Sequence, residues 1–158
     1  MNTLAEMVEV AKKECKAHGV TVTRKRVNLY SLLLLSDKAV SAYELVDSYF
    51  EMFHQPVPVI TVYRVLDFLQ NNNLVHKLET ENKFIACTHT HCGNSDSSSQ
   101  FLICKQCLKV KEFSMSESAI KELKETVDQA GFRLNNSQLE MDCICKDCYE
   151  KTQTHKLN

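Results

Sequence analysis

The sequence predicts an α+β fold, in which an N-terminal winged helix-turn-helix domain is followed by a small α/β domain. Two observations carry this prediction. In the first half of the chain, segments with helical spacing of apolar residues precede two short strand-like segments joined by a turn. In the second half, strand-like segments flank an amphipathic helix, and a Cys-x-x-Cys pair stands near each end of that half.

The first half contains four helical segments, each with a recognisable start or stop. They cover residues 3–18, 23–35, 41–53 and 61–69. The third begins with Ser41-Ala-Tyr-Glu44, a capping box in which the Ser and Glu side chains bond otherwise free backbone amides. A turn at Asn71-Asn72-Asn73 ends the fourth, and residues 74–78 and 83–86 then form a β-hairpin.

Helices followed by a hairpin are typical of the winged helix-turn-helix, which binds DNA. A generic helical domain with a hairpin is the alternative. The short connector between the third and fourth helices and nearby basic residues favour the DNA-binding reading. Net charge is −1, so DNA contacts must come from a local patch. The cluster Arg24-Lys25-Arg26 is the best candidate, with Arg64 further along the chain.

A polar linker at residues 88–100 separates the two halves. We therefore expect a DNA-binding domain at 1–86, a hinge at 87–100 and a second domain at 101–158. In the second domain we expect strands at 101–104, 110–113 and 132–141. A helix that begins at Ser116 and ends at Gly131 lies between the second and third of them.

Two Cys-x-x-Cys pairs indicate a metal site of high specificity. Cys104 and Cys107 form the first pair, and Cys145 and Cys148 form the second. Four thiolates complete a tetrahedral zinc shell and leave no open position for a substrate. Cys143 offers an alternative ligand pair, because Cys143-Ile-Cys145 is able to supply two sulfurs in place of Cys145-x-x-Cys148. A spare thiol near the zinc is the simpler interpretation of Cys143.

A second group of metal-binding residue types remains after that assignment. Its members mix nitrogen, sulfur and oxygen donors: His76, Cys87, His89, His91, Cys92 and Glu112. Such a set suits Zn²⁺, and the soft cysteine ligand argues against a hard iron(II) site. Each member alone has a structural explanation, as a surface histidine, a solvated charge or a small buried residue. The clustering of several of them favours a metal.

Several protein classes are disfavoured. We find no apolar run long enough to span a membrane and no signal-peptide pattern, so we expect a cytoplasmic protein with no membrane partner. The paired cysteines fit metal binding better than a secreted disulfide scaffold. A metalloenzyme or a zinc/thiol redox protein is the alternative from another class. No His-Glu-x-x-His or other poised general base is present, so we expect no catalytic residues, no enzyme activity and no small-molecule substrate.

Motifs along nearly the whole chain resemble the ferric uptake regulator (Fur) family. Ile60-Thr-Val-Tyr-Arg-Val-Leu-Asp-Phe-Leu69 resembles the family's recognition helix. Val75-His-Lys, Phe101-Leu-Ile-Cys-x-x-Cys107 and Cys145-x-x-Cys148 follow in the family's order. Three features are most similar to the zinc uptake regulator (Zur) branch: Ser41-Ala-Tyr-Glu-Leu, Leu66-Asp-Phe-Leu-x₅-Val-His-Lys and the cysteine at position 87.

The resemblance implies a homodimeric, zinc-responsive repressor of zinc-uptake genes that binds double-stranded operator DNA, with two zinc ions per protomer. The four Cys-x-x-Cys thiols would hold a structural zinc, and the second domain would dimerise. The regulatory zinc would be held by His76, Cys87, His91 and Glu112, with His89 or Cys92 as alternatives to His91. The resemblance implies that Tyr43 and Arg64 contact bases. Phosphates would be contacted by Tyr63, Arg24, Lys25 and Arg26, and Thr61 would also bind DNA. A sensor of iron, manganese, nickel or peroxide within the same family is the alternative.

Three departures from the family pattern matter. The hinge is longer than in the Zur branch, which leaves the choice among the hinge ligands open. Arg24 stands where the family usually has a proline. The His-His-Asp-His run that is common in iron-sensing members is absent, which disfavours a third metal site and leaves its existence open.

Overall fold

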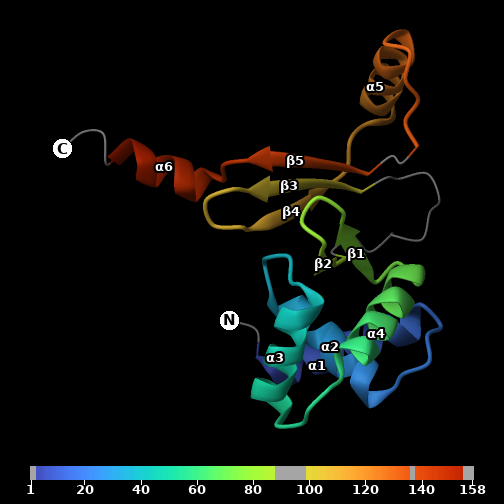
Figure 1. The fold of residues 1–158 in the computed structure, drawn as a ribbon, viewed down its shortest axis with the longest axis vertical. Helices are drawn as coiled ribbons and strands as arrows, with labels where there is room; N and C mark the ends of the chain where they lie inside the picture. The colour runs from blue at the N-terminus through green and yellow to red at the C-terminus, as the bar shows by residue number, and fades with distance from the viewer. Residues whose placement is uncertain (1–2, 88–98, 136–137, 155–158) are drawn as a thin grey trace. The chain divides into compact units, whose positions relative to one another are not determined.

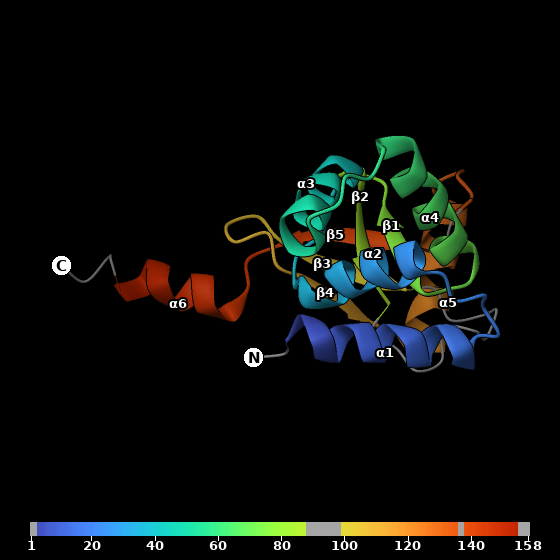
Figure 2. The same cartoon turned by 90° about the horizontal axis from the view of Figure 1, so that it is seen from below.

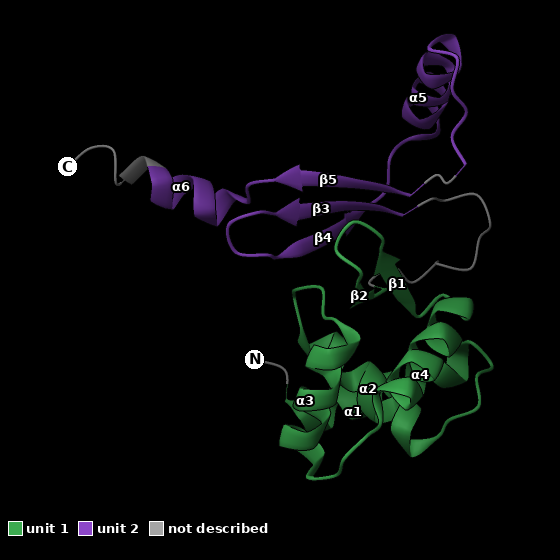
Figure 3. Ribbon diagram, in the orientation of Figure 1, with its two compact units in different colours: residues 1–93 green, residues 94–158 purple. Residues whose placement is uncertain are grey.

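The computed structural model describes residues 3–87, 99–135 and 138–154. The chain divides into two compact units, residues 1–93 and 94–158 (Figure 3). We call them unit 1 and unit 2 and describe each by itself. The predicted hinge lies almost entirely outside the described residues, so its boundaries stay a prediction.

Unit 1 contains the four predicted helices. They are α1 (Leu4–Ala17), α2 (Arg24–Leu35), α3 (Ala42–Phe53) and α4 (Val59–Asn71). The side chains of Thr3, Thr23 and Ser41 accept hydrogen bonds from backbone amides in the first turns of α1, α2 and α3. The capping box predicted at Ser41 is present. Helix α4 begins earlier and ends later than predicted, because Pro58 occupies its N-cap position and the helix continues into the Asn-rich turn.

A single hydrophobic core holds these helices together. Helices α1 and α2 pack side by side (Figure 2). Helices α1, α3 and α4 each bury one face, whereas α2 is buried continuously from Val27 to Leu33. The fully buried side chains of the core include Tyr30, Tyr49, Leu66 and Leu69. Burial of such side chains stabilises a fold by roughly 1.5–3 kcal/mol each. The core therefore sets the position of α4 within unit 1.

The predicted hairpin follows α4 as β1 (Val75–Leu78) and β2 (Lys83–Ala86), which pair in antiparallel register. Val40, just before α3, adds a bridge to Phe84. The Lys83 ammonium lies 3.2 Å from a carboxylate oxygen of Glu44, which ties the hairpin to α3. The backbone amide of Ser41 and then Lys83 lower the pKa of Glu44, which keeps this link charged at neutral pH. Four helices followed by this hairpin form a winged helix-turn-helix.

Unit 2 has the expected order of strand, strand, helix and strand, followed by one further helix. The elements are β3 (Gln100–Cys104), β4 (Val110–Phe113), α5 (Glu117–Gln129), β5 (Leu139–Cys143) and α6 (Lys146–Thr154). Strand β3 lies in the centre of the sheet, antiparallel to β4 and parallel to β5 (Figure 1). The chain between the parallel strands β3 and β5 includes β4 and α5, and it is long enough for the crossover that a parallel pair requires.

The predicted third strand at 132–141 was wrong in its extent. The observed strand runs from Leu139 to Cys143, and Phe132 is 74% exposed. The reason is pairing: β5 matches β3 residue for residue from Gln100 to Cys104, and β3 begins only there. The sequence analysis also missed α6, which starts directly after Cys145.

Helix α5 presents an amphipathic surface. Half-buried apolar side chains share one face of the helix at helical spacing: Ile120, Leu123 and Val127. No residue of α5 is fully buried within this chain. In Figure 1 the helix extends away from the sheet of its own unit. Among the described residues, no helix is long and apolar enough to cross a bilayer.

Candidate metal centres and nucleic-acid interface

The four predicted thiols converge at one end of the sheet in unit 2. Cys104 ends β3, and Cys107 lies in the turn before β4. Cys145 immediately precedes α6, and Cys148 lies in its first turn. Two hydrogen bonds shape the first turn: Leu108 N–H donates to the Cys104 carbonyl at 2.8 Å, and Lys105 N–H donates to the Cys143 carbonyl at 2.9 Å.

The sulfur geometry fits a tetrahedral zinc ion. All four Sγ atoms lie within 4.8 Å of one another, and the Cys107 and Cys145 sulfurs are 3.7 Å apart. Sulfurs bound at about 2.3 Å to a tetrahedral ion are separated by about 3.8 Å. Cys143 lies on β5 beside Cys104 but is not a member of this four-sulfur group.

Electrostatics at this cluster also favour a cation. Backbone amides, first of all that of Cys145, lower the pKa of Cys104 to about 6, which favours its thiolate. The neighbouring thiols, led by Cys145, raise the pKa of Cys148 to about 12, since a second negative charge there is penalised. A divalent cation removes that penalty by neutralising the crowded thiolates.

The second predicted ligand set is distributed over both units. In unit 1, His76 lies on β1 and pairs with Ile85, while the Cys87 amide donates to the Leu74 carbonyl at 2.9 Å. This pairing places His76 and Cys87 on the same face of the hairpin, and a ring nitrogen of His76 lies within 4.8 Å of the Cys87 sulfur. Cys87 is disulfide-bonded in this structure, so metal binding there requires its reduced thiol.

Glu112, the fourth member of the predicted set, lies on β4 in unit 2 and is buried. One of its carboxylate oxygens accepts a hydrogen bond of 2.6 Å from the Ser99 hydroxyl. The hinge candidates His89, His91 and Cys92 lie outside the described residues. The composition of this ligand set therefore stays a prediction.

The predicted base-contacting residues are solvent-accessible in unit 1. Tyr43, the second residue of α3, is 66% exposed, and Arg64 is exposed in the middle of α4. Thr61 and Tyr63 are half-buried, and Tyr63 packs against the hydrophobic core. Tyr43 and Arg64 are thus available to a ligand, whereas Tyr63 also has a structural role.

The three basic residues at the start of α2 do not form one continuous exposed surface. Arg24 and Lys25 are exposed, whereas Arg26 is half-buried. The Arg26 guanidinium carbon lies 3.5 Å from the centroid of the Phe68 ring on α4, and Arg26 Nη1 donates to the Thr21 carbonyl at 2.9 Å. Arg26 therefore connects the start of α2 to α4, which the sequence did not indicate.

We expect Arg26→Ala to lower the free energy of unfolding by about 1–2 kcal/mol, because it removes a cation–π contact and a hydrogen bond. Urea denaturation followed by circular dichroism measures this difference. Lys25→Ala, one position away but exposed, serves as the control and should change stability by less than about 0.5 kcal/mol. Equal stabilities of the two variants would show that the Arg26 contacts contribute nothing.

Two residues on α4 were missed by the sequence analysis. Phe68 is the stacking partner of Arg26, and Ile60 is an isoleucine exposed to 58% on the same helix. The sequence did contain a signal for both residues. Ile60 and Phe68 each lie four positions from Arg64, and residues four apart are neighbours on a helix surface.

Comparison with known proteins is consistent with this arrangement. Residues 17–142 match the model of the ferric uptake regulator family. The zinc uptake regulation protein of Escherichia coli (strain K12) is 34% identical over 148 residues, which cover 94% of this chain and 84% of that protein. A ferric uptake regulation protein of Helicobacter pylori (strain 26695) is 26% identical over 154 residues, covering 95% and 96% of the two chains.

Solved structures extend the similarity to the fold. A zinc uptake regulator in complex with zinc and DNA superposes with a TM-score of 0.75 at 31% identity, covering 97% of this chain and 99% of that one. The holo form of the zinc uptake regulator XcZur gives 0.72 at 32% identity, with coverages of 94% and 99%. The shared fold is an N-terminal winged helix-turn-helix with a C-terminal dimerisation domain.

Members of the matched family are metal-responsive transcriptional repressors that bind DNA as homodimers. The family model spans most of the chain, and a relative more than 30% identical covers it almost from end to end. On these grounds, the chain belongs to the ferric uptake regulator family.

Proposed function

We propose that this protein is a zinc-responsive repressor of zinc-uptake genes, acting as a cytoplasmic homodimer on operator DNA. The choice of metal rests on the pair of His76 and Cys87, which lie on one face of the β1–β2 hairpin. This hairpin is the wing of the winged helix-turn-helix and is called the wing hairpin below. Nitrogen and thiolate sulfur are donors that zinc favours, and a thiolate is a poor ligand for hard cations. The zinc-bound relatives support the same choice.

Each protomer would hold two zinc ions with different tasks. The four thiolates of unit 2 would bind a structural ion, whose chemistry is to neutralise and cross-link them. The regulatory ion would be held by His76, Cys87, Glu112 and a hinge residue, His91 in the first place, with His89 or Cys92 as alternatives. Because these ligands come from both units, the second ion would restrict how the units move relative to each other.

Restricting that motion would regulate DNA binding. A dimer presents two recognition helices to two half-sites, and their separation must match the DNA helical repeat. For an almost complete switch, zinc must favour the competent arrangement by roughly 5 kcal/mol. The binding free energies of protein zinc sites, roughly 10–16 kcal/mol, are large enough to supply this difference.

The DNA contacts would divide by chemistry. Tyr43 and Arg64 are exposed on α3 and α4, and an arginine reads guanine through two acceptors in the major groove. Arg24 and Lys25 would contact phosphates, together with Thr61 and the partly exposed Tyr63. In the second unit, the apolar face of α5 that includes Ile120 and Leu123 supports pairing with a second copy of the chain.

Metal specificity is the test of this function. We expect footprinting of genomic DNA fragments to show protected sites with zinc and none after the regulatory zinc is removed by a chelator. The reduced protein is required, because the Cys87 thiol must be free to bind the ion. Restoration of protection by iron(II), manganese or nickel but not by zinc would instead identify another sensor of the same family, as similarity to a ferric uptake regulation protein allows.

A further inference from the structure

The solvent face of α4 is a regular stripe with one unexpected member. Ile60, Arg64, Asp67 and Asn71 are all exposed and follow one another at helical spacing. The opposite face is buried in the core and includes Val62 and Leu66. Three of the four exposed residues carry hydrogen-bonding groups that suit base edges. Ile60 carries none, yet it is 58% exposed.

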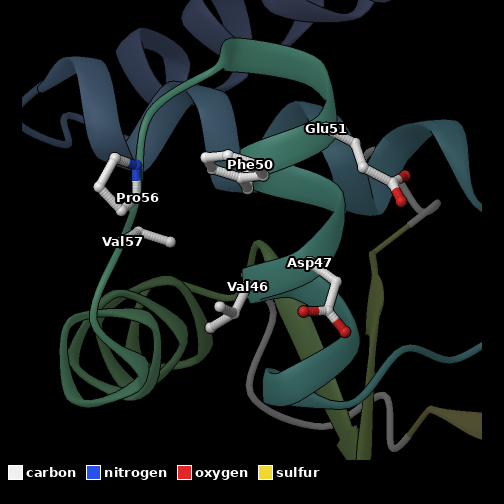
Figure 4. A pocket seen from close by; sticks show the side chains of 6 residues that line it. All are labelled: Val46, Asp47, Phe50, Glu51, Pro56 and Val57. Carbon is white, nitrogen blue, oxygen red and sulfur yellow. The ribbon is translucent and has the colours of Figure 1, made fainter.

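Ile60 also differs from the other apolar residues at the start of the helix. Val59 and Tyr63 pack against the hydrophobic core, whereas Ile60 is not among the residues that do so. Phe50, another of the exposed apolar side chains of unit 1, lies on α3 instead. It faces Pro56 and Val57 across a surface hollow (Figure 4). Ile60 therefore belongs to the surface of α4 that a ligand would meet.

The position of Ile60 defines what it would meet. In helix-turn-helix proteins the N-terminal residues of the recognition helix contact base edges in the major groove, and Ile60 is the second residue of α4. It lies one turn before Arg64, about 6 Å along the helix axis. Base pairs are about 3.4 Å apart, so Ile60 would meet a base pair one or two steps from the one at Arg64.

Chemistry then selects the base. In the major groove, thymine is the base that presents an apolar group, its C5 methyl, whereas the other bases present donors and acceptors there. An isoleucine against those polar edges would leave them without hydrogen bonds. We propose that Ile60 is a specificity-determining residue that recognises a thymine methyl in each half-site. This inference rests on the proposed role of α4 as the recognition helix.

The test combines a protein change with removal of the methyl from DNA. Each thymine of a footprinted site is replaced in turn by deoxyuridine, and the Kd of the zinc-loaded, full-length dimer is measured. With the wild-type protein we expect about a 4-fold loss of affinity per half-site at one symmetry-related thymine, the effect of one buried methyl group. With Ile60→Ala we expect the thymine and deoxyuridine duplexes to bind equally well at that position.

Controls keep the outcomes separate. Phe50→Ala, an equally exposed apolar residue outside the α4 stripe, should retain the wild-type deoxyuridine penalty. Because Ile60 is exposed and alanine favours helix, the circular dichroism spectrum and zinc content of Ile60→Ala should be unchanged. A deoxyuridine penalty in Ile60→Ala equal to that of wild type at every thymine overturns the inference.

Arg64→Ala distinguishes this inference from the proposed function. If Arg64→Ala loses preference for the site while Ile60→Ala keeps the full deoxyuridine penalty, α4 is the recognition helix and only the role of Ile60 is wrong. If Arg64→Ala binds the site as tightly and as selectively as wild type, the proposed role of α4 fails, and the inference about Ile60 fails with it.

Discussion

Replacing Cys104 by serine is expected to remove the proposed structural zinc and to unfold unit 2. Cys104 is buried and lies within 4.8 Å of three other ligand sulfurs. Without the ion, the turn after β3 and the start of α6 lose the cross-link that holds them together. Structural zinc sites contribute about 10–16 kcal/mol of binding free energy in small domains, which exceeds the stability that a unit of this size has from its own core.

Zinc content by atomic absorption and dimer mass by light scattering measure this effect. Wild-type protein kept in a mild chelator should retain the structural zinc, whereas Cys104→Ser should contain one zinc fewer per protomer and should not dimerise. Cys143→Ser is the matched control, because Cys143 is paired with Cys104 in the sheet but lies outside the four-sulfur group. Loss of zinc from Cys143→Ser and not from Cys104→Ser would show that the assigned ligands are wrong.

The second large effect is expected at the proposed regulatory site. His76→Ala and Cys87→Ser should each abolish zinc-dependent DNA binding while leaving a folded dimer. Each change removes one donor from the wing hairpin, and a site with a lost ligand no longer favours the DNA-competent arrangement. The loss should approach the full zinc-dependent gain in affinity, which is on the order of 100-fold when zinc raises the DNA-competent fraction from about 1% to about 99%.

Fluorescence anisotropy with a footprinted duplex measures this loss in reducing buffer, with zinc and with a chelator. Both variants should retain one tightly bound zinc and the wild-type dimer mass, which separates them from Cys104→Ser. His18→Ala serves as the histidine control, because His18 is exposed at the end of α1 and far in sequence from the proposed ligands. Wild-type zinc dependence in both His76→Ala and Cys87→Ser would exclude this site as the sensor.

The comparison of sequence with structure shows where local information suffices. Helix starts at Thr23 and Ser41 were predicted correctly, since a capping hydroxyl acts within three residues of itself. The hairpin and the two Cys-x-x-Cys pairs are also local patterns, and the structure brings the four thiols together as the spacing predicts. The extent of β5 was mispredicted because it depends on a partner strand far away in the sequence.

By itself, the sequence determined the class of the protein: a winged helix-turn-helix unit, a cluster of four cysteines with metal-ligand spacing and the motifs of a metal-responsive repressor. Each of these is encoded by residue types at short, regular spacing, which is how capping, turns and paired ligands work. Only the tertiary structure decided which side chains of α2 and α4 pack within unit 1 and which remain exposed on its surface. Packing turned Arg26 onto Phe68 and left Ile60 exposed beside Arg64, because contacts between helices depend on the shape of the whole core.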